Sequence, residues 1–290
     1  MFKLGIITDE ITQDLEKALQ FASEQKLDCF ELRSAWEKDP FEYTDEDFAE
    51  IKRLSDKYNI PLVSISSPFY KCSYFDSDTR KKHIDGLRRL IEKAEFLGVS
   101  QIRCFDFFRD SRITLDMISE AYAIPISLCE NRGITLLIES EPSANSFNCK
   151  KTADTVRHIN SPYVKALYEP GNNMYGCTEE IPFPDGYRYV KDIFCHVHIK
   201  DAVIRDGKTV GVAIGSGDVA YEEMFEEFID SGYSGAVILE PHYKPGGAIS
   251  EELLRNPKGS MFSEGGFIAS EECITAVNRI LNKIGTVKLK

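Results

Sequence analysis

The sequence has no long hydrophobic run and no excess of basic residues. No stretch approaches the roughly 18 apolar residues that a membrane-spanning helix needs. Asp9 ends the short apolar run at the N-terminus, which is too short for the core of a signal peptide. Lys and Arg total 35 against 47 Asp and Glu, and the resulting net charge of −12 repels phosphate backbones and anionic lipids. We therefore expect a soluble, cytoplasmic protein that binds neither nucleic acid nor a membrane.

Motifs of two other protein classes are also missing. The 8 cysteines include no Cys-x-x-Cys pair and several lie in apolar runs, which favours buried free thiols over a disulfide framework. The first apolar run continues into residues 9–12 without a Gly-x-Gly-x-x-Gly loop, the usual marker of a dinucleotide-binding doubly wound sheet.

What the sequence does contain is an alternation of short apolar runs and amphipathic stretches. The β-rich runs lie near residues 2–8, 28–34, 61–66, 101–107, 135–141, 164–169, 195–200 and 236–242. Several are nearly continuous in Val, Ile and Leu, as expected for strands buried on both faces. Between them, apolar residues recur at three- and four-residue spacing, which predicts helices, as in 84–97 and 274–284. Pro125 predicts a kink or two short helices in 114–131.

Eight strand–helix units in 290 residues match an α/β fold, the (β/α)8 TIM barrel. A doubly wound open sheet is the main alternative. No linker or shift in composition divides the chain, so we predict a single domain over residues 1–290. A long connection rich in Gly and Pro, 243–269, follows the last run. Because such loops are usually functional or disordered, we expect a lid or a contact arm of a homo-oligomer.

Carboxylates and histidines gather where the last four predicted strands end, which is where barrel enzymes have their active sites. Carboxylates among Leu, Ile and Val need a compensating partner in a core. A divalent cation is one such partner, and three carboxylates with one imidazole suit Mn2+, Co2+, Zn2+ or Mg2+. Salt bridges to Arg33, Arg103 or Lys200 across the barrel mouth are the alternative. The four candidate metal ligands are Glu139, Glu169, His198 and Glu240.

The strings around these residues resemble the xylose-isomerase-like TIM barrel superfamily, also described as AP endonuclease family 2. It contains sugar and sugar-phosphate isomerases and epimerases, inosose dehydratases and endonuclease IV. The resemblance covers most of the chain. The matching strings are LLIESE (136–141), YEPGN (168–172), HVHIKDA (196–202), GSGDVAYEEM (215–224) and SGYSGAVILEPH (231–242), with GIITDEI (5–11) and FELRSAW (30–36).

The resemblance implies that the four candidate ligands hold a metal, and that Glu139 and Glu240 flank the substrate as acid and base. The chain departs from the family at two positions. The strand-six ligand is usually Asp and is Glu169 here, which leaves open whether this residue ligates the metal. A His often follows the strand-five Glu by two positions, and here that residue is Glu141. An endonuclease IV activity is disfavoured because it needs many histidines, and the chain has 5.

Such a site suits chemistry at a carbon next to a carbonyl. A carboxylate cannot remove that proton unaided, whereas a metal that holds the carbonyl and the neighbouring hydroxyl stabilises the enediolate. Return of the proton to the opposite side of the same carbon gives epimerisation, and return to the adjacent carbon gives aldose–ketose isomerisation. Loss of a β-hydroxyl instead gives dehydration. We predict a metal-dependent sugar or polyol isomerase/epimerase that acts on a small-molecule substrate. A dehydratase of an inosose-like keto-polyol and a catalytically silent barrel relative stay open as alternatives.

Five further residues near the mouth are candidate substrate contacts: Arg33, Glu141, Lys200, Arg205 and His242. Basic residues are few there, and Glu141 adds a negative charge. Because a like charge near a phosphate costs binding energy, we expect an unphosphorylated substrate.

Overall fold

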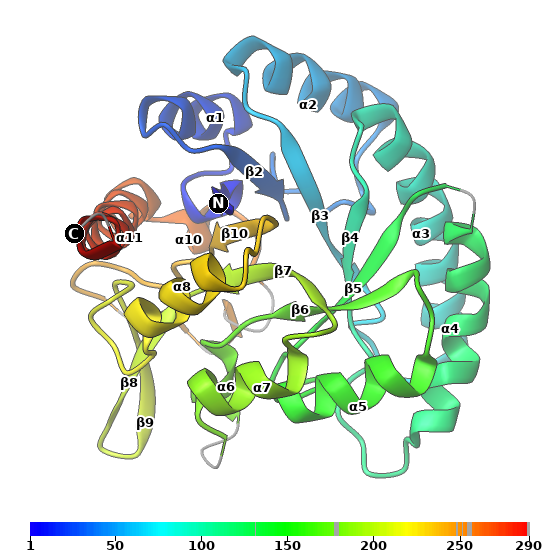
Figure 1. Cartoon of the computed structure of the whole chain (residues 1–290). Coiled ribbons are helices and arrows are strands. Elements are labelled where there is room, and N and C mark those ends of the chain that lie inside the picture. Colours follow the sequence, from blue (N-terminus) through cyan, green and yellow to red (C-terminus); the bar gives the residue numbers. More distant parts are fainter. Residues whose placement is uncertain (131, 177–179, 248, 251, 254–256, 289–290) are drawn as a thin grey trace.

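The computed structural model describes residues 1–130, 132–176, 180–247, 249–250, 252–253 and 257–288. Within this part of the chain, eight parallel strands close into a barrel in the order β1-β10-β7-β6-β5-β4-β3-β2 (Figure 1). Each strand overlaps one of the predicted apolar runs, which confirms the TIM barrel. The strands are β1 (Lys3–Ile7), β2 (Cys29–Leu32), β3 (Leu62–Phe69), β4 (Gln101–Cys104), β5 (Thr135–Glu139), β6 (Val164–Tyr168), β7 (Phe194–Ile199) and β10 (Ala236–Leu239).

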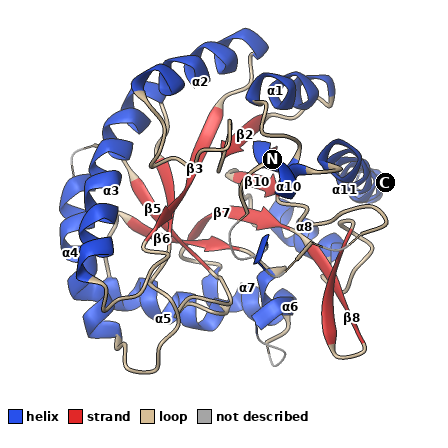
Figure 2. Cartoon of the chain, turned by 180° about the vertical axis from the view of Figure 1, so that it is seen from behind, coloured by secondary structure: helices blue, strands red, loops and turns tan. Residues whose placement is uncertain are grey.

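Helices cover the outside of the barrel in both views (Figures 1 and 2). Their apolar faces pack on the strands, so the main hydrophobic core lies between the two layers. No helix in the described residues is long and apolar enough to cross a membrane. The helices are α1 (Leu15–Glu24), α2 (Asp45–Tyr58), α3 (Ser77–Leu97), α4 (Leu115–Cys129), α5 (Cys149–Ile159), α6 (Asn172–Gly176), α7 (Tyr187–Val190), α8 (Tyr221–Asp230), α10 (Ser260–Ser263) and α11 (Gly266–Lys288), with the short turns η1 (Thr8–Glu10) and η2 (Pro182–Gly186).

Helix α4 runs through Pro125 as one helix, rather than as the two short helices that were one expectation. Proline lacks the N–H that would bond to the carbonyl four residues earlier, which is that of Ala121. The hydroxyl of Tyr70 donates to this carbonyl at 2.9 Å. A side chain from the end of β3 therefore replaces the missing helical hydrogen bond.

The antiparallel hairpin of β8 (Asp201–Arg205) and β9 (Lys208–Val212) was not predicted. It extends from the barrel directly after β7 (Figure 1). Asp206 and Gly207 form its turn with φ of 51° and 72°, and an Asp-Gly pair with two positive φ values is a strong hairpin signal. The short flanking runs hid this signal in the sequence.

The long connection after β10 packs against the start of the chain. Ser263 donates through Oγ to the carbonyl oxygen of Asp9 at 2.7 Å, and the Phe262 ring lies 4.9 Å from the Arg33 guanidinium carbon. Residues 248, 251 and 254–256 of this connection lie outside the described residues. The predicted role as lid or oligomer contact stays a prediction, as does the assignment of 1–290 to one domain.

Candidate metal centre and cavity

The four predicted ligands meet at the carboxyl end of the barrel. Glu139 ends β5, Glu169 directly follows β6, His198 lies one residue before the end of β7, and Glu240 directly follows β10. Each is at most 2% exposed. One ligand atom from each lies within 4.8 Å of one from every other. Four strands thus bring together groups that are up to 101 residues apart in the sequence (240 − 139).

Two atoms of this group have no hydrogen-bond partner, although they are buried: His198 Nδ1 and Glu169 Oε2. His198 Nδ1 lies 3.5 Å from Glu139 Oε1 and 3.9 Å from Glu240 Oε2. The other oxygen of Glu169 accepts from the Gly171 N–H at 2.8 Å. Buried polar atoms without a hydrogen-bond partner are costly unless something compensates them. Three carboxylates and an imidazole with two orphaned atoms therefore fit a divalent cation.

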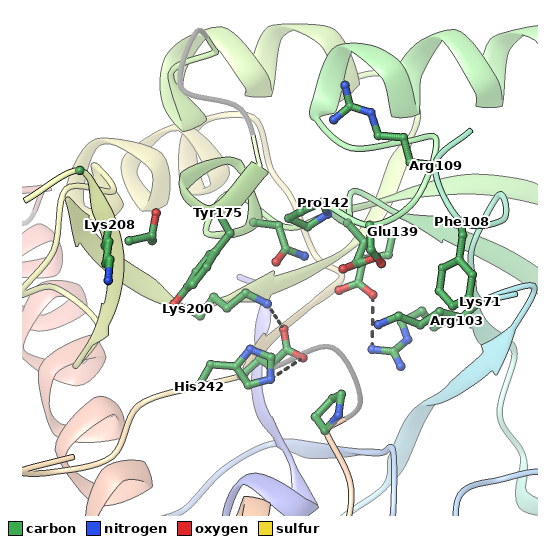
Figure 3. Close-up of a pocket in the computed structure, with 17 residues that line it drawn as sticks. Lys71, Arg103, Phe108, Arg109, Glu139, Pro142, Tyr175, Lys200, Lys208 and His242 are labelled. Carbon is green, nitrogen blue, oxygen red and sulfur yellow. Dashed lines mark hydrogen bonds and ion pairs between the residues drawn. The ribbon is translucent and has the colours of Figure 1, made fainter. Parts of the chain in front are cut away.

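Basic side chains also contact these carboxylates. Arg103 Nη1 lies 3.3 Å from Glu139 Oε2. Lys200 Nζ lies 2.6 Å from Glu240 Oε2 (Figure 3). It also lies 3.7 Å from Glu169 Oε2. The salt bridges that we considered as the alternative to a metal ion are therefore present together with the ligand cluster.

The electrostatic environment differs among the three carboxylates of the cluster. Burial raises the pKa of Glu169 to about 8, with Lys200 opposing and Glu240 adding to the rise. Burial also acts to raise the pKa of Glu240, but Lys200, His242 and Arg33 hold it well below its usual range. Burial likewise acts to raise the pKa of Glu139, but Arg103 and His198 together lower it below its usual value. The two proposed acid–base carboxylates are thus kept ionised.

Arg33 lies behind Glu240 rather than in the cavity. It is 3% exposed, and its Nη1 donates to Glu240. Its remaining donors bind Asp9 (Nη2–Oδ1 2.9 Å, Nε–Oδ2 3.1 Å) and Glu10 (Nη2–Oε1 2.6 Å). The planar fork of one guanidinium therefore fixes three carboxylates, including one of the proposed ligands.

A cavity of about 920 Å³ opens on the ligand cluster (Figure 3). Glu139 and Glu240 reach its wall, and three of the five predicted substrate contacts join them there: Glu141, Lys200 and His242. The structure does not bring the other two into the described wall. Arg33 is engaged behind Glu240, and Arg205 is exposed near the tip of the hairpin. Further wall residues are Lys71, Arg103, Phe108, Arg109, Pro142, Ser143, Asn172, Tyr175, Gly207, Lys208, Thr209 and Pro257.

Sequence reasoning missed Glu31, which is fully buried in β2. His198 Nε2 lies 3.0 Å from Glu31 Oε1, and His196 Nε2 lies 2.6 Å from Oε2. The hydroxyl of Ser66 also donates to this carboxylate. Burial raises the pKa of Glu31, but the two imidazoles hold it well below its usual range. Glu31 engages Nε2 of His198, which leaves Nδ1 facing the other ligands.

A signal for Glu31 was present in the sequence. It is the charged residue inside the apolar string CFEL, two positions before Arg33 and thus on the same face of the strand. A charge at an inward position of a barrel strand needs a buried partner. The sequence could not show that the partners are His196 and His198.

Solved structures of known proteins share this fold. D-psicose 3-epimerase from Clostridium cellulolyticum H10, crystallised with D-tagatose, has a TM-score of 0.73 at 17% identity, covering 97% of this chain and 99% of that one. IolI protein with a bound zinc atom has a TM-score of 0.73 at 14% identity, covering 98% and 99%. The xylose isomerase domain protein from Planctomyces limnophilus has a TM-score of 0.72 at 16% identity, covering 98% and 99%.

At these identities the structures establish the fold and nothing finer. The family model described as "Xylose isomerase-like TIM barrel" matches residues 19–258, well over half of the sequence. The chain therefore belongs to the xylose isomerase-like TIM barrel family.

Proposed function

We propose that the protein is a divalent-metal-dependent isomerase or epimerase of a small-molecule sugar or polyol. The observation that carries the proposal is the convergence of Glu139, Glu169, His198 and Glu240, with two of their buried atoms lacking a hydrogen-bond partner. The epimerase and the zinc-containing protein of the same fold support it.

The four side chains would hold the cation, for which Mn2+, Co2+, Zn2+ and Mg2+ are the candidates. A cation there supplies Lewis-acid polarisation of the substrate carbonyl and the hydroxyl next to it. His198 is oriented for this task by Glu31, and Glu240 by the ion pair with Arg33.

Glu139 and Glu240 would act as base and acid because both reach the cavity, and their lowered pKa values keep either one ready to accept a proton. One carboxylate takes a proton from the carbon next to the carbonyl. The other carboxylate first takes up a proton from solvent and returns it to the same carbon from the opposite side, which inverts that carbon, and the first carboxylate then releases its proton to solvent. Proton return to the adjacent carbon instead converts ketose to aldose. Ion pairs with Arg103 and Lys200 hold the two carboxylates in place, as general acid–base catalysis requires.

A second candidate is a barrel relative that binds no metal. Its support is the ammonium of Lys200, which contacts both Glu240 and Glu169 and so compensates part of the negative charge without a cation. Dehydration of a keto-polyol would use the same carboxylates. Only the products distinguish dehydration from isomerisation and epimerisation.

The experiment is an NMR assay in D2O with a panel of ketoses and cyclic keto-polyols, each with and without the four candidate metals. Deuterium incorporated next to the carbonyl reports proton abstraction, and the product identifies isomerisation, epimerisation or dehydration. Glu139→Gln and Glu240→Gln should abolish exchange, because each loses a base but keeps its shape. Glu92→Gln, an exposed change on α3, is the control. Exchange at the wild-type rate in either cavity variant would exclude that residue as base.

A further inference from the structure

The cavity wall is basic although the chain is acidic. The described wall carries five basic side chains (Lys71, Arg103, Arg109, Lys200 and Lys208) and three carboxylates (Glu139, Glu141 and Glu240), a formal sum of +2 (5 − 3). The whole chain has a net charge of −12. A cavity whose sign opposes that of its protein concentrates anions in preference to neutral molecules.

Two of these cations lie together at the ends of β3 and β4. Lys71 follows β3 by two residues, and Arg103 is the third residue of β4. Lys71 Nζ and the Arg103 guanidinium carbon each lie 5.0 Å from the centre of the same Phe105 ring. Figure 3 shows both side chains beside Glu139, on the side of the cavity away from Lys200 and His242.

The backbone N–H of Lys71 donates to the Pro68 carbonyl oxygen at 2.9 Å, whereas its ammonium makes no ion pair or hydrogen bond with a described residue. Burial lowers the pKa of its ammonium, with Glu141 the strongest opposing influence and Arg103 adding to the fall. Glu141 itself accepts a hydrogen bond from Ser143. A half-buried cation that faces a cavity without a partner is a place for a ligand anion.

Arg103 is also only partly used. It is 6% exposed, and its Nε is buried without a hydrogen-bond partner. Nη1 pairs with Glu139 at 3.3 Å, and Nη2 makes a long contact of 3.4 Å with the Ser66 carbonyl oxygen. A guanidinium with five donors and two such partners retains capacity for an anion.

We propose that Lys71 and Arg103 form a subsite for a carboxylate at one end of the substrate, which makes the substrate class a keto-sugar acid. The proposal rests on the proposed function, because the subsite adjoins the same metal centre and Glu139. A carboxylate is favoured over a phosphate by the local charge. Arg103 is already shared with Glu139, and Glu141 is near Lys71. The two cations can therefore balance the single charge of a carboxylate, whereas Glu139 and Glu141 would repel the second charge of a phosphate. We therefore still expect a substrate without a phosphate group, but one that carries a carboxylate at one end.

The test uses matched pairs that differ only at carbon 6: D-fructose with D-fructuronate, and D-tagatose with D-tagaturonate. D-fructose 6-phosphate is the third probe of anion type. Binding to the full chain is measured calorimetrically with Mn2+ in the buffer and at fixed ionic strength. We expect at least one uronate to bind at least about 10-fold more tightly than its ketose, which is a usual gain for a charge-assisted contact.

Lys71→Met should reduce this preference to less than 2-fold, because the variant loses the charge that distinguishes the uronate from its ketose. Lys208→Met removes the same charge from the hairpin side of the cavity and should keep the preference. Arg103 is not the primary variant because it also holds Glu139. A circular dichroism melt of each variant confirms that it is folded.

Several outcomes would overturn the subsite. These are equal binding within both pairs, no binding of either uronate, a preference that survives in Lys71→Met, and tighter binding of the phosphate ester. Failure of the proposed function can be distinguished from failure of the subsite. Turnover of neutral ketoses without any uronate preference keeps the proposed function and overturns the subsite. Uronate binding through Lys71 without deuterium exchange keeps the subsite and overturns the proposed function.

Discussion

Replacing Glu31 with glutamine should weaken the proposed metal centre without changing any of its ligands. The Glu31 carboxylate lies 3.0 Å from His198 Nε2 and 2.6 Å from His196 Nε2, and it also accepts from Ser66. Glutamine keeps the shape but has one acceptor oxygen and an NH2 group in place of two acceptors. It cannot accept from both imidazoles through separate oxygens, so the orientation and basicity of His198 are lost in part.

The size of the effect follows from this geometry. Loss of a partner that orients a metal-ligating histidine typically weakens metal affinity by about 10- to 100-fold, or roughly 1.4 to 2.7 kcal/mol. Because Glu31 is fully buried, one donor left without an acceptor should also lower the free energy of unfolding by about 1 to 3 kcal/mol. The variant should still fold, since its volume is unchanged.

The assay is a calorimetric titration with Co2+, together with the visible spectrum of the bound ion as a readout of ligand geometry. Glu141→Gln is the matched control, because this carboxylate lines the cavity and its hydrogen bond is to Ser143, not to a ligand. We expect weaker Co2+ binding and an altered spectrum in Glu31→Gln, with little change in Glu141→Gln. A folded Glu31→Gln variant with wild-type affinity and spectrum would refute the orienting role.

Three further predictions concern stability. Tyr70→Phe removes the donor to the Ala121 carbonyl and should lower the free energy of unfolding by about 1 kcal/mol in denaturant titrations; an unchanged midpoint would show that the bond contributes nothing. Burial raises the pKa of Asp106 from 3.8 to about 6, so the folded state holds this proton more tightly than the unfolded state. Its contribution to stability should therefore fall as pH rises from about 4 to about 6, by roughly 3 kcal/mol at most. Denaturant titrations at both pH values should show this loss in the wild type and not in Asp106→Asn. An equal change in the free energy of unfolding between the two pH values in both proteins would contradict the prediction. Gly171→Ala places a Cβ against the Lys200 carbonyl oxygen, and the melting temperature should fall because the backbone must shift; a wild-type value would show that the loop yields at no cost.

The barrel could be predicted because its signals are local. Each strand is a short apolar run buried on both faces, and each helix has its own three- and four-residue spacing. The hairpin 201–212 was missed because its strands are only partly buried, so their hydrophobic pattern is weak. The course of α4 through Pro125 depends on Tyr70, which lies 55 residues earlier (125 − 70) and gives no sign in the helix sequence.

The candidate site could be predicted in part for the same reason. Barrel topology places strand ends together, so charged residues at the ends of β5, β6, β7 and β10 had to meet. Partners that depend on which side chains face each other across the barrel could not be deduced. Glu31 and His198 are 167 residues apart, and Arg33 and Glu240 are 207 apart. The pairing of Lys71 with Arg103 around Phe105 likewise appears only in three dimensions.

We propose that Glu139, Glu169, His198 and Glu240 hold a divalent cation, and the metal stoichiometry and affinity of EDTA-treated protein test this directly. Titration with Mn2+, Co2+, Zn2+ and Mg2+ should show about one ion per chain for at least one metal. That metal should raise the melting temperature, because a ligand of the folded state stabilises it. The His198→Ala variant, which removes the imidazole ligand, should lose at least tenfold in affinity. A wild-type protein that binds none of the four metals, and that none of them stabilises, would contradict a metal site at these four residues.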